Sequence, residues 1–74
     1  MSDQNLDEYA EKMLNFIIRM KEEENIEHLM IADVDLYFFS NGYAKEENVA
    51  ALEMLIKTEK IDILNKKEIY LLDR

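Results

Sequence analysis

The sequence predicts a single α+β domain in which three helices precede a C-terminal β-hairpin. Two stretches, residues 3–24 and residues 45–59, repeat apolar side chains with helical spacing, and residues 60–72 alternate them on both sides of a polar turn. The chain of 74 residues suits one small domain, residues 1–74, and its apolar fraction of 49% is sufficient for a core.

The first stretch, residues 3–24, carries the strongest helical pattern. Its apolar stripe consists of Leu6, Tyr9, Ala10, Met13, Phe16, Ile17 and Met20, with Leu14 at the edge. Asp3 suits the positive end of a helix dipole. Three glutamates at 22–24 lie at the opposite end, where negative charge is unfavourable. We therefore expect the helix to end just before Asn25.

Residues 26–43 allow two interpretations. A helix would place four apolar residues on one side, namely Ile31, Val34, Tyr37 and Phe38. A strand would make the apolar residues alternate with Asp33 and Asp35. The strand interpretation gives an alternative fold, in which two helices pack on a three-stranded sheet and residues 30–39 form one of its strands.

We favour the helical interpretation of this stretch. It predicts a short extended piece at 28–30, followed by a helix over 31–40. The pair Asn41 and Gly42 ends the element in either case, because glycine adopts positive φ without steric cost.

The last helix and the hairpin are predicted from their apolar positions. The helix is expected to turn Val49, Ala51, Leu52, Leu55 and Ile56 toward the core, with Glu46, Glu53 and Lys57 opposite. The hairpin strands are expected to carry Ile61, Ile63, Ile69 and Leu71, joined by a turn at Asn65, Lys66 and Lys67.

This order of elements resembles a winged helix-turn-helix domain. The segment VAALEMLIKTEKI at 49–61 is similar to the third helix and first wing strand of that class, and IDIL at 61–64 and EIYLL at 68–72 would be the wing strands. The resemblance covers residues 6–72. It implies a third helix that enters the major groove of DNA and a wing that contacts phosphates.

Carried onto this chain, the resemblance gives a poor DNA reader. The groove-facing positions would be Lys45, Glu46, Asn48, Glu53 and Lys57, and the residues expected to contact DNA are Lys45, Asn48, Lys57, Lys66 and Lys67. Glutamates in the groove-facing set would meet phosphates, and the third helix has no arginine, the commonest base reader. DNA binding, as a dimeric transcriptional regulator, is therefore the alternative function.

The charge also argues against general nucleic-acid binding. The net charge is −8, whereas such binding depends on Lys and Arg. Residues 1–35 contain ten acids and three bases, a net of −7, and residues 36–74 contain seven acids and six bases, a net of −1. The acidic character therefore belongs mainly to the first half.

No residue pattern indicates catalysis or a bound ion. His28 is the only histidine, the chain has no cysteine, and neither Ser2 nor Ser40 lies in a nucleophile motif. Asp33 and Asp35 are close in sequence but lack a third ligand. We expect no enzymatic activity, no cofactor and no metal.

The acidic residues suggest a more specific function than solubility. The candidate acidic face consists of Asp7, Glu8, Glu11, Glu22, Glu23, Glu24 and Glu27. Such a face can serve only to keep a small domain soluble, or it can imitate a phosphate array and dock on a basic protein. In size and charge the chain resembles the small acidic inhibitors of phages and mobile elements, which include nucleic-acid mimics that block host defences.

Apolar side chains outside the core are expected to anchor such a partner. The candidates are Leu36, Phe39, Tyr43 and Met54. The expected partner is a basic host protein, and self-association into a homodimer is a further expectation. The polar N-terminal residues and the absence of cysteine favour the cytoplasm over secretion, and no membrane association is expected.

Overall fold

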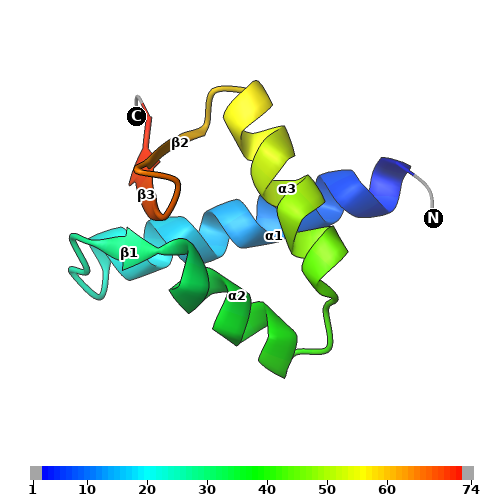
Figure 1. Cartoon of the computed structure of the whole chain (residues 1–74), viewed down its shortest axis with the longest axis horizontal. Coiled ribbons are helices and arrows are strands. Elements are labelled where there is room, and N and C mark those ends of the chain that lie inside the picture. Colours follow the sequence, from blue (N-terminus) through cyan, green and yellow to red (C-terminus); the bar gives the residue numbers. More distant parts are fainter. Residues whose placement is uncertain (1–2, 73–74) are drawn as a thin grey trace.

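The computed structural model describes residues 3–72. The elements are α1 (Asp3–Glu22), β1 (Leu29–Met30), α2 (Ile31–Ser40), α3 (Lys45–Lys57), β2 (Ile61–Leu64) and β3 (Glu68–Leu71) (Figure 1). The predicted α+β class is confirmed. The first and third helices each end two residues earlier than predicted.

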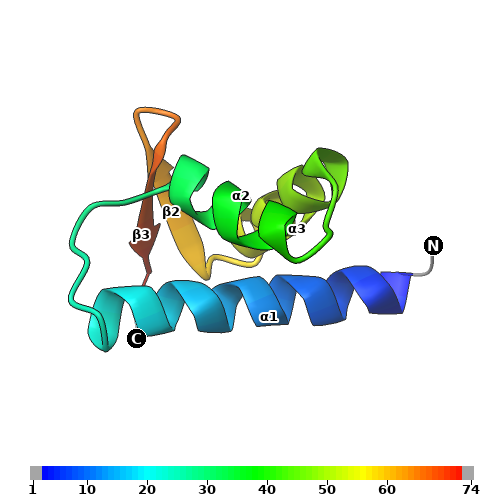
Figure 2. The ribbon, with the colours of Figure 1, turned by 90° about the horizontal axis from the view of Figure 1, so that it is seen from below.

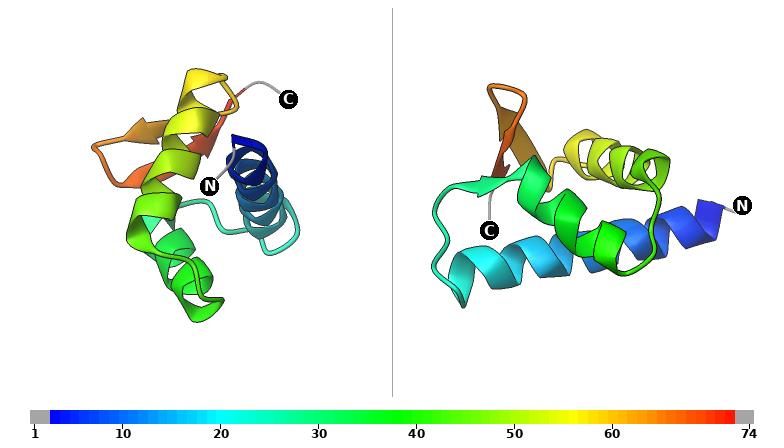
Figure 3. Two further views of the ribbon diagram at one scale, coloured as in Figure 1. Left: turned by 90° about the vertical axis from the view of Figure 1, so that its right-hand side faces the viewer. Right: turned by 60° about the horizontal axis from the view of Figure 1, so that its bottom comes forward.

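The long helix α1 forms one layer, and both shorter helices lie on one side of it (Figure 2). The hairpin of β2 and β3 stands near the C-terminal half of α1, and its tip projects away from that helix (Figure 3). The surfaces of α2 and α3 that face away from α1 are therefore on the same side of the molecule as the hairpin tip.

The sheet has three antiparallel strands in the order β1-β3-β2. The extended piece predicted at 28–30 supplies the third strand, because Leu29 pairs with Ile69 and Met30 with Glu68. The alternative that residues 30–39 form a strand is wrong. The helix buries Val34 and Phe38 together on one side. A strand would instead have placed Tyr37 and Phe39 on the same face as the two aspartates.

The core lies between α1 and the layer of short helices and strands. The predicted stripe of α1 is confirmed, with Tyr9, Ala10, Met13, Phe16 and Ile17 buried and Leu6, Leu14 and Met20 packed against them. No helix within residues 3–72 is long and apolar enough to cross a membrane.

The predicted apolar side of α3 is partly wrong. Its buried residues are Asn48, Ala51, Leu52 and Leu55. Val49 and Ile56 are instead 45% and 39% exposed. The helix is rotated because Asn48 occupies an inner position, where its amide Nδ2 donates a hydrogen bond to Asp35 Oδ1 of α2 at 3.1 Å.

Left-handed residues mark the chain reversals. After α1, Asn25 has φ of 58°, and the next amide, Ile26 N–H, donates to Met20 O at 3.0 Å. Gly42 has φ of 91° after α2, as predicted. The hairpin turn has positive φ at both Asn65 and Lys66, the backbone that suits a tight hairpin.

Candidate partner-binding surfaces

The acidic residues singled out in the sequence do not form one surface. All seven are exposed, but they fall in two stretches, 7–11 in the first half of α1 and 22–27 at its end and in the loop that follows. Glu11 and Glu22 are eleven residues apart on the same helix, which corresponds to about 16 Å at the helical rise. Between them the exposed positions of α1 include Lys12 and Arg19. The arrangement is two separate acidic groups with cations between them, rather than a continuous row.

The four candidate apolar anchors fall into two kinds. Leu36 and Phe39 are exposed, with 68% and 44% of their surface accessible. Tyr43 and Met54 are half-buried against the core. The Tyr43 ring stacks on Tyr9 with centroids 4.3 Å apart. Leu36 therefore offers most of its surface to a partner and Phe39 slightly less than half, whereas Tyr43 and Met54 offer less than either.

Two further exposed apolar residues of α3 were missed by sequence reasoning. Val49 and Ile56 lie seven residues apart on the helix, and so project from the same flank. We call Leu36, Phe39, Val49 and Ile56 the outer apolar surface. One signal in the sequence could have revealed it: the apolar residues of α3 span too wide an arc for one buried side.

Within the outer apolar surface, Val49 has charged side chains beside it. A shallow hollow of about 440 Å³ along α3 is lined by Lys45, Glu46, Val49, Ala50 and Glu53. Glu46 and Glu53 are exposed. Glu47, in contrast, is structural, because its Oε1 accepts a hydrogen bond from Ala44 N–H at the start of α3 at 2.8 Å.

The residues proposed for DNA contact are not all available. Asn48 is fully buried, so its expected role as a groove-facing residue is wrong. Lys45, Lys57, Lys66 and Lys67 are exposed. Lys45 and Lys57 lie at opposite ends of α3, which places them about 18 Å apart by the helical rise. The part of α3 between these two lysines contains the exposed acidic and apolar residues described above.

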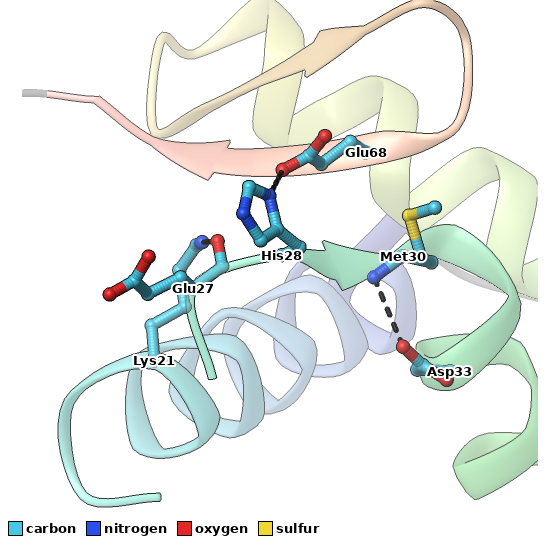
Figure 4. Close-up of polar contacts among 6 residues, drawn as sticks. All are labelled: Lys21, Glu27, His28, Met30, Asp33 and Glu68. Carbon is cyan, nitrogen blue, oxygen red and sulfur yellow. Dashed lines mark hydrogen bonds and ion pairs between the residues drawn. The ribbon is translucent and has the colours of Figure 1, made fainter. Parts of the chain in front are cut away.

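The two aspartates considered for a metal have separate structural partners. Asp33 Oδ2 accepts the Met30 N–H at the start of α2 at 3.1 Å (Figure 4). Asp35 accepts from Asn48, as described above. Across residues 3–72, no group of three or more His, Cys, Asp or Glu side chains is arranged to hold a metal ion.

The single histidine links the chain before β1 to β3. His28 Nδ1 lies 2.6 Å from Glu68 Oε2 (Figure 4). This hydrogen bond is the main reason that the pKa of Glu68 is lowered, and the charge of Lys21 contributes in the same direction. Ser40 Oγ donates to Leu36 O at 2.9 Å within α2. His28 and Ser40 therefore both have local structural contacts.

Comparison of the chain with protein-family models, with curated proteins and with solved structures finds no match.

Proposed function

We propose that this chain is a non-enzymatic protein-binding module that docks on another protein through its outer apolar surface. The observation that carries the proposal is the exposure of four large apolar side chains on α2 and α3, the two short helices that lie on one side of α1 (Figure 2). Interfaces are typically centred on such side chains, with polar groups around them. The expected occupant is a folded partner protein rather than a small ligand, because the accompanying hollow is shallow and its described lining residues all come from one helix, α3.

The charge supports a basic partner. Glu46 and Glu53 line the hollow beside Val49, together with Lys45, and the whole chain carries a net charge of −8. Long-range attraction speeds the encounter with a positively charged surface, and opposite charges at the rim select against acidic competitors. Together with the small size, these features support an inhibitor of the phage or mobile-element kind, acting on a host protein in the cytoplasm.

The proposal includes a winged-helix origin for the fold. The element order and the β1-β3-β2 sheet support it, and α3 then corresponds to the helix that reads DNA in that class. In this chain that helix exposes valine, isoleucine and glutamate and contains no arginine. These side chains favour binding to a protein surface that is partly apolar and positively charged over binding to a phosphate backbone.

The test is affinity capture from host lysate with nuclease present. The tagged wild-type chain should retain a basic protein at a fixed stoichiometry, and less of it as salt rises. The double variant Leu36→Ser with Val49→Ser should lose that protein. Leu64→Ser is the matched control, because Leu64 is similarly exposed, at 46%, but lies on β2. Unchanged capture by the double variant contradicts the proposal.

A second copy of the chain is the other partner to test. Light scattering over a range of concentrations measures self-association directly. A dimer that disappears in the Leu36→Ser and Val49→Ser double variant would assign the outer apolar surface to dimerisation instead of to a host protein.

The alternative function is DNA binding, favoured by the exposed lysines of the hairpin tip. Lys66 and Lys67 are exposed at the hairpin tip, which under the winged-helix resemblance would be the wing that contacts phosphates. DNA retardation that is abolished by Lys66→Glu with Lys67→Glu would support this alternative. The control is Lys12→Glu with Arg19→Glu, which changes the net charge equally but acts on α1.

A further inference from the structure

A second hollow lies between α1 and the C-terminal end of α2. Its volume is about 460 Å³, within the range of small-molecule sites. The hollow is lined by four aromatic rings, those of Phe16, Tyr37, Phe38 and Tyr43, and by two cations, Lys12 and Arg19. The amide side chains of Asn15 and Asn41 also line it. We call it the aromatic cleft. It differs from the outer apolar surface in location and in the sign of its charge.

The rings of the aromatic cleft hold one another in place. Tyr37 stacks on Phe16 with centroids 4.1 Å apart and an angle of 16° between planes. The buried Phe38 ring meets both of these rings edge-on, and it meets Tyr43 at 5.6 Å. Tyr37 nevertheless remains 41% exposed. Phe16 therefore fixes one face of the Tyr37 ring, while part of the residue remains accessible in the cleft.

The cations of the cleft are placed along one side of α1. Lys12 Nζ donates to the Tyr43 hydroxyl at 3.3 Å and lies 5.9 Å from the centre of that ring. Arg19 follows seven residues later on the same side of the helix, about 10 Å along it. Asn15 lies between them, and Glu23 is the one acid among the described lining residues.

This local charge is opposite to that of the chain. The sequence has 17 acids and nine Lys and Arg residues, yet the cleft has two cations and one acid. An arginine fork binds carboxylate or phosphate in a defined geometry. The aromatic rings and the two cations of the cleft together suit a ligand that has a flat ring and a negative group.

We propose that the aromatic cleft binds a small planar aromatic anion. Its ring stacks on the exposed part of Tyr37, and its carboxylate or phosphate pairs with Arg19 and Lys12. This site is independent of the proposed docking surface, because none of the four residues of the outer apolar surface lines the cleft.

The test is an NMR titration of the full chain, labelled with nitrogen-15, at millimolar ligand. The probes are AMP for an aromatic phosphate and indoleacetate for an aromatic carboxylate. The controls are adenosine and tryptamine, which keep the ring without the anion, and inorganic phosphate, which keeps the anion without the ring. Saturable shifts confined to amides near residues 12–19 and 37–43, with either anion or both, support the proposal, and the anion that binds identifies the source of the negative group.

Two variants assign the binding to the cleft. Arg19→Gln should weaken binding of the active probe by at least about tenfold, as expected for loss of a charge-assisted hydrogen bond. Lys57→Gln removes the same charge from an exposed position of α3 and should bind as wild type. The proposal is overturned if neither anion produces saturable shifts, if a control compound binds equally well, or if Arg19→Gln binds like wild type.

Discussion

Two pairs of adjacent residues show how differently the inner and outer sides of the short helices are used. On α2, Phe38 is 1% exposed and Phe39 is 44% exposed. On α3, Asn48 is fully buried and the neighbouring Val49 is 45% exposed. The first pair consists of two phenylalanines, so their difference in exposure comes only from their positions on the helix. In the second, the polar side chain is inside and the apolar one outside: Asn48 Nδ2 donates to Asp35 Oδ1, while Asn48 Oδ1 has no partner among the described residues.

The burial of Asn48 beside an exposed Val49 reverses the usual order of polar and apolar residues. Isolated apolar residues on a surface are common and need no explanation. Here the inner position could have been filled by an apolar residue, but it holds an amide that joins α3 to Asp35 of α2. Val49 and Ile56 are exposed on α3, and Leu36 and Phe39 are exposed on α2, the helix that packs beside it.

The largest expected effect comes from the aromatic pair. Phe38→Ala should lower the free energy of unfolding by about 3–5 kcal/mol, because it leaves a cavity among four other rings. Phe39→Ala should change it by no more than about 0.5 kcal/mol, as expected for a surface position. Urea unfolding followed by circular dichroism measures both. Similar losses of unfolding free energy in the two variants would contradict the different roles assigned to the inner and outer sides of α2.

The second prediction concerns the buried amide. Asn48→Ala should cost about 1–3 kcal/mol, because it leaves the Asp35 carboxylate without its partner. Val49→Ala is the control and should stay within about 0.5 kcal/mol of wild type.

A double-mutant cycle tests the physical reason for that cost. The pair Asp35→Leu with Asn48→Leu should recover part of the stability lost in the single variants, because replacing both polar partners leaves no unpaired group. Purely additive losses would show that the two side chains act separately.

The sequence predicted the elements well because their signals are local. The stripe of α1, the helix at 31–40 and the hairpin all depend on residues close in the chain. The rotation of α3 could not be predicted, because it depends on a contact between Asn48 and a residue thirteen positions earlier. For the same reason the extended piece at 28–30 was predicted, but its pairing with Ile69 was not.

The candidate sites were harder to predict than the fold. Acidic residues that appear clustered in sequence composition are divided by the length of α1 into two groups. The aromatic cleft combines rings from α1, from α2 and from the loop after it. Its shape depends on how the helices pack, which a periodic pattern does not specify.

The pair of His28 and Glu68, whose side chains are 74% and 14% exposed, gives a contrast to the buried pair and a smaller effect. Because the hydrogen bond with His28 lowers the pKa of Glu68, this carboxylate stabilises the fold at pH values above its ordinary pKa of 4.5. The contribution is lost as the pH falls below that value toward the lower pKa of the folded state. Glu68→Gln should therefore make the melting temperature less sensitive to acid.

Thermal melts between about pH 6 and about pH 3, the range in which carboxylates titrate, measure this effect. Glu53→Gln removes an exposed carboxylate of α3 and is the control. Equal flattening of the acid response in both variants would show that the His28 contact has no specific contribution.

The smallest expected effect at neutral pH comes from the inner tyrosine. The Tyr9 hydroxyl is buried and has no hydrogen-bond partner in the described part of the chain. Tyr9→Phe should therefore change the free energy of unfolding by less than about 1 kcal/mol at pH 7. A large loss would reveal a contact of this hydroxyl that the core depends on.

The same variant should differ from wild type in alkali. Burial is the main cause of the raised pKa of Tyr9, and the charges of Glu47, Tyr43 and Asp35 add to it. This residue therefore favours folding below its ordinary pKa of 10.0, and the contribution falls as the pH rises above that value. Tyr9→Phe should lose less stability in alkali than wild type, whereas Tyr37→Phe, with an exposed ring, is the control.

The chain reversals have a consequence for engineering this domain. With one glycine and no proline, the reversals use left-handed residues of other types, including Glu59 at φ 62° and Lys66 at φ 62°. A side chain with a Cβ typically loses about 1 kcal/mol in this conformation, whereas asparagine tolerates it better. Asparagine at these two positions would give a more robust scaffold, on which the surfaces of α2 and α3 could be redesigned for new partners without loss of the fold.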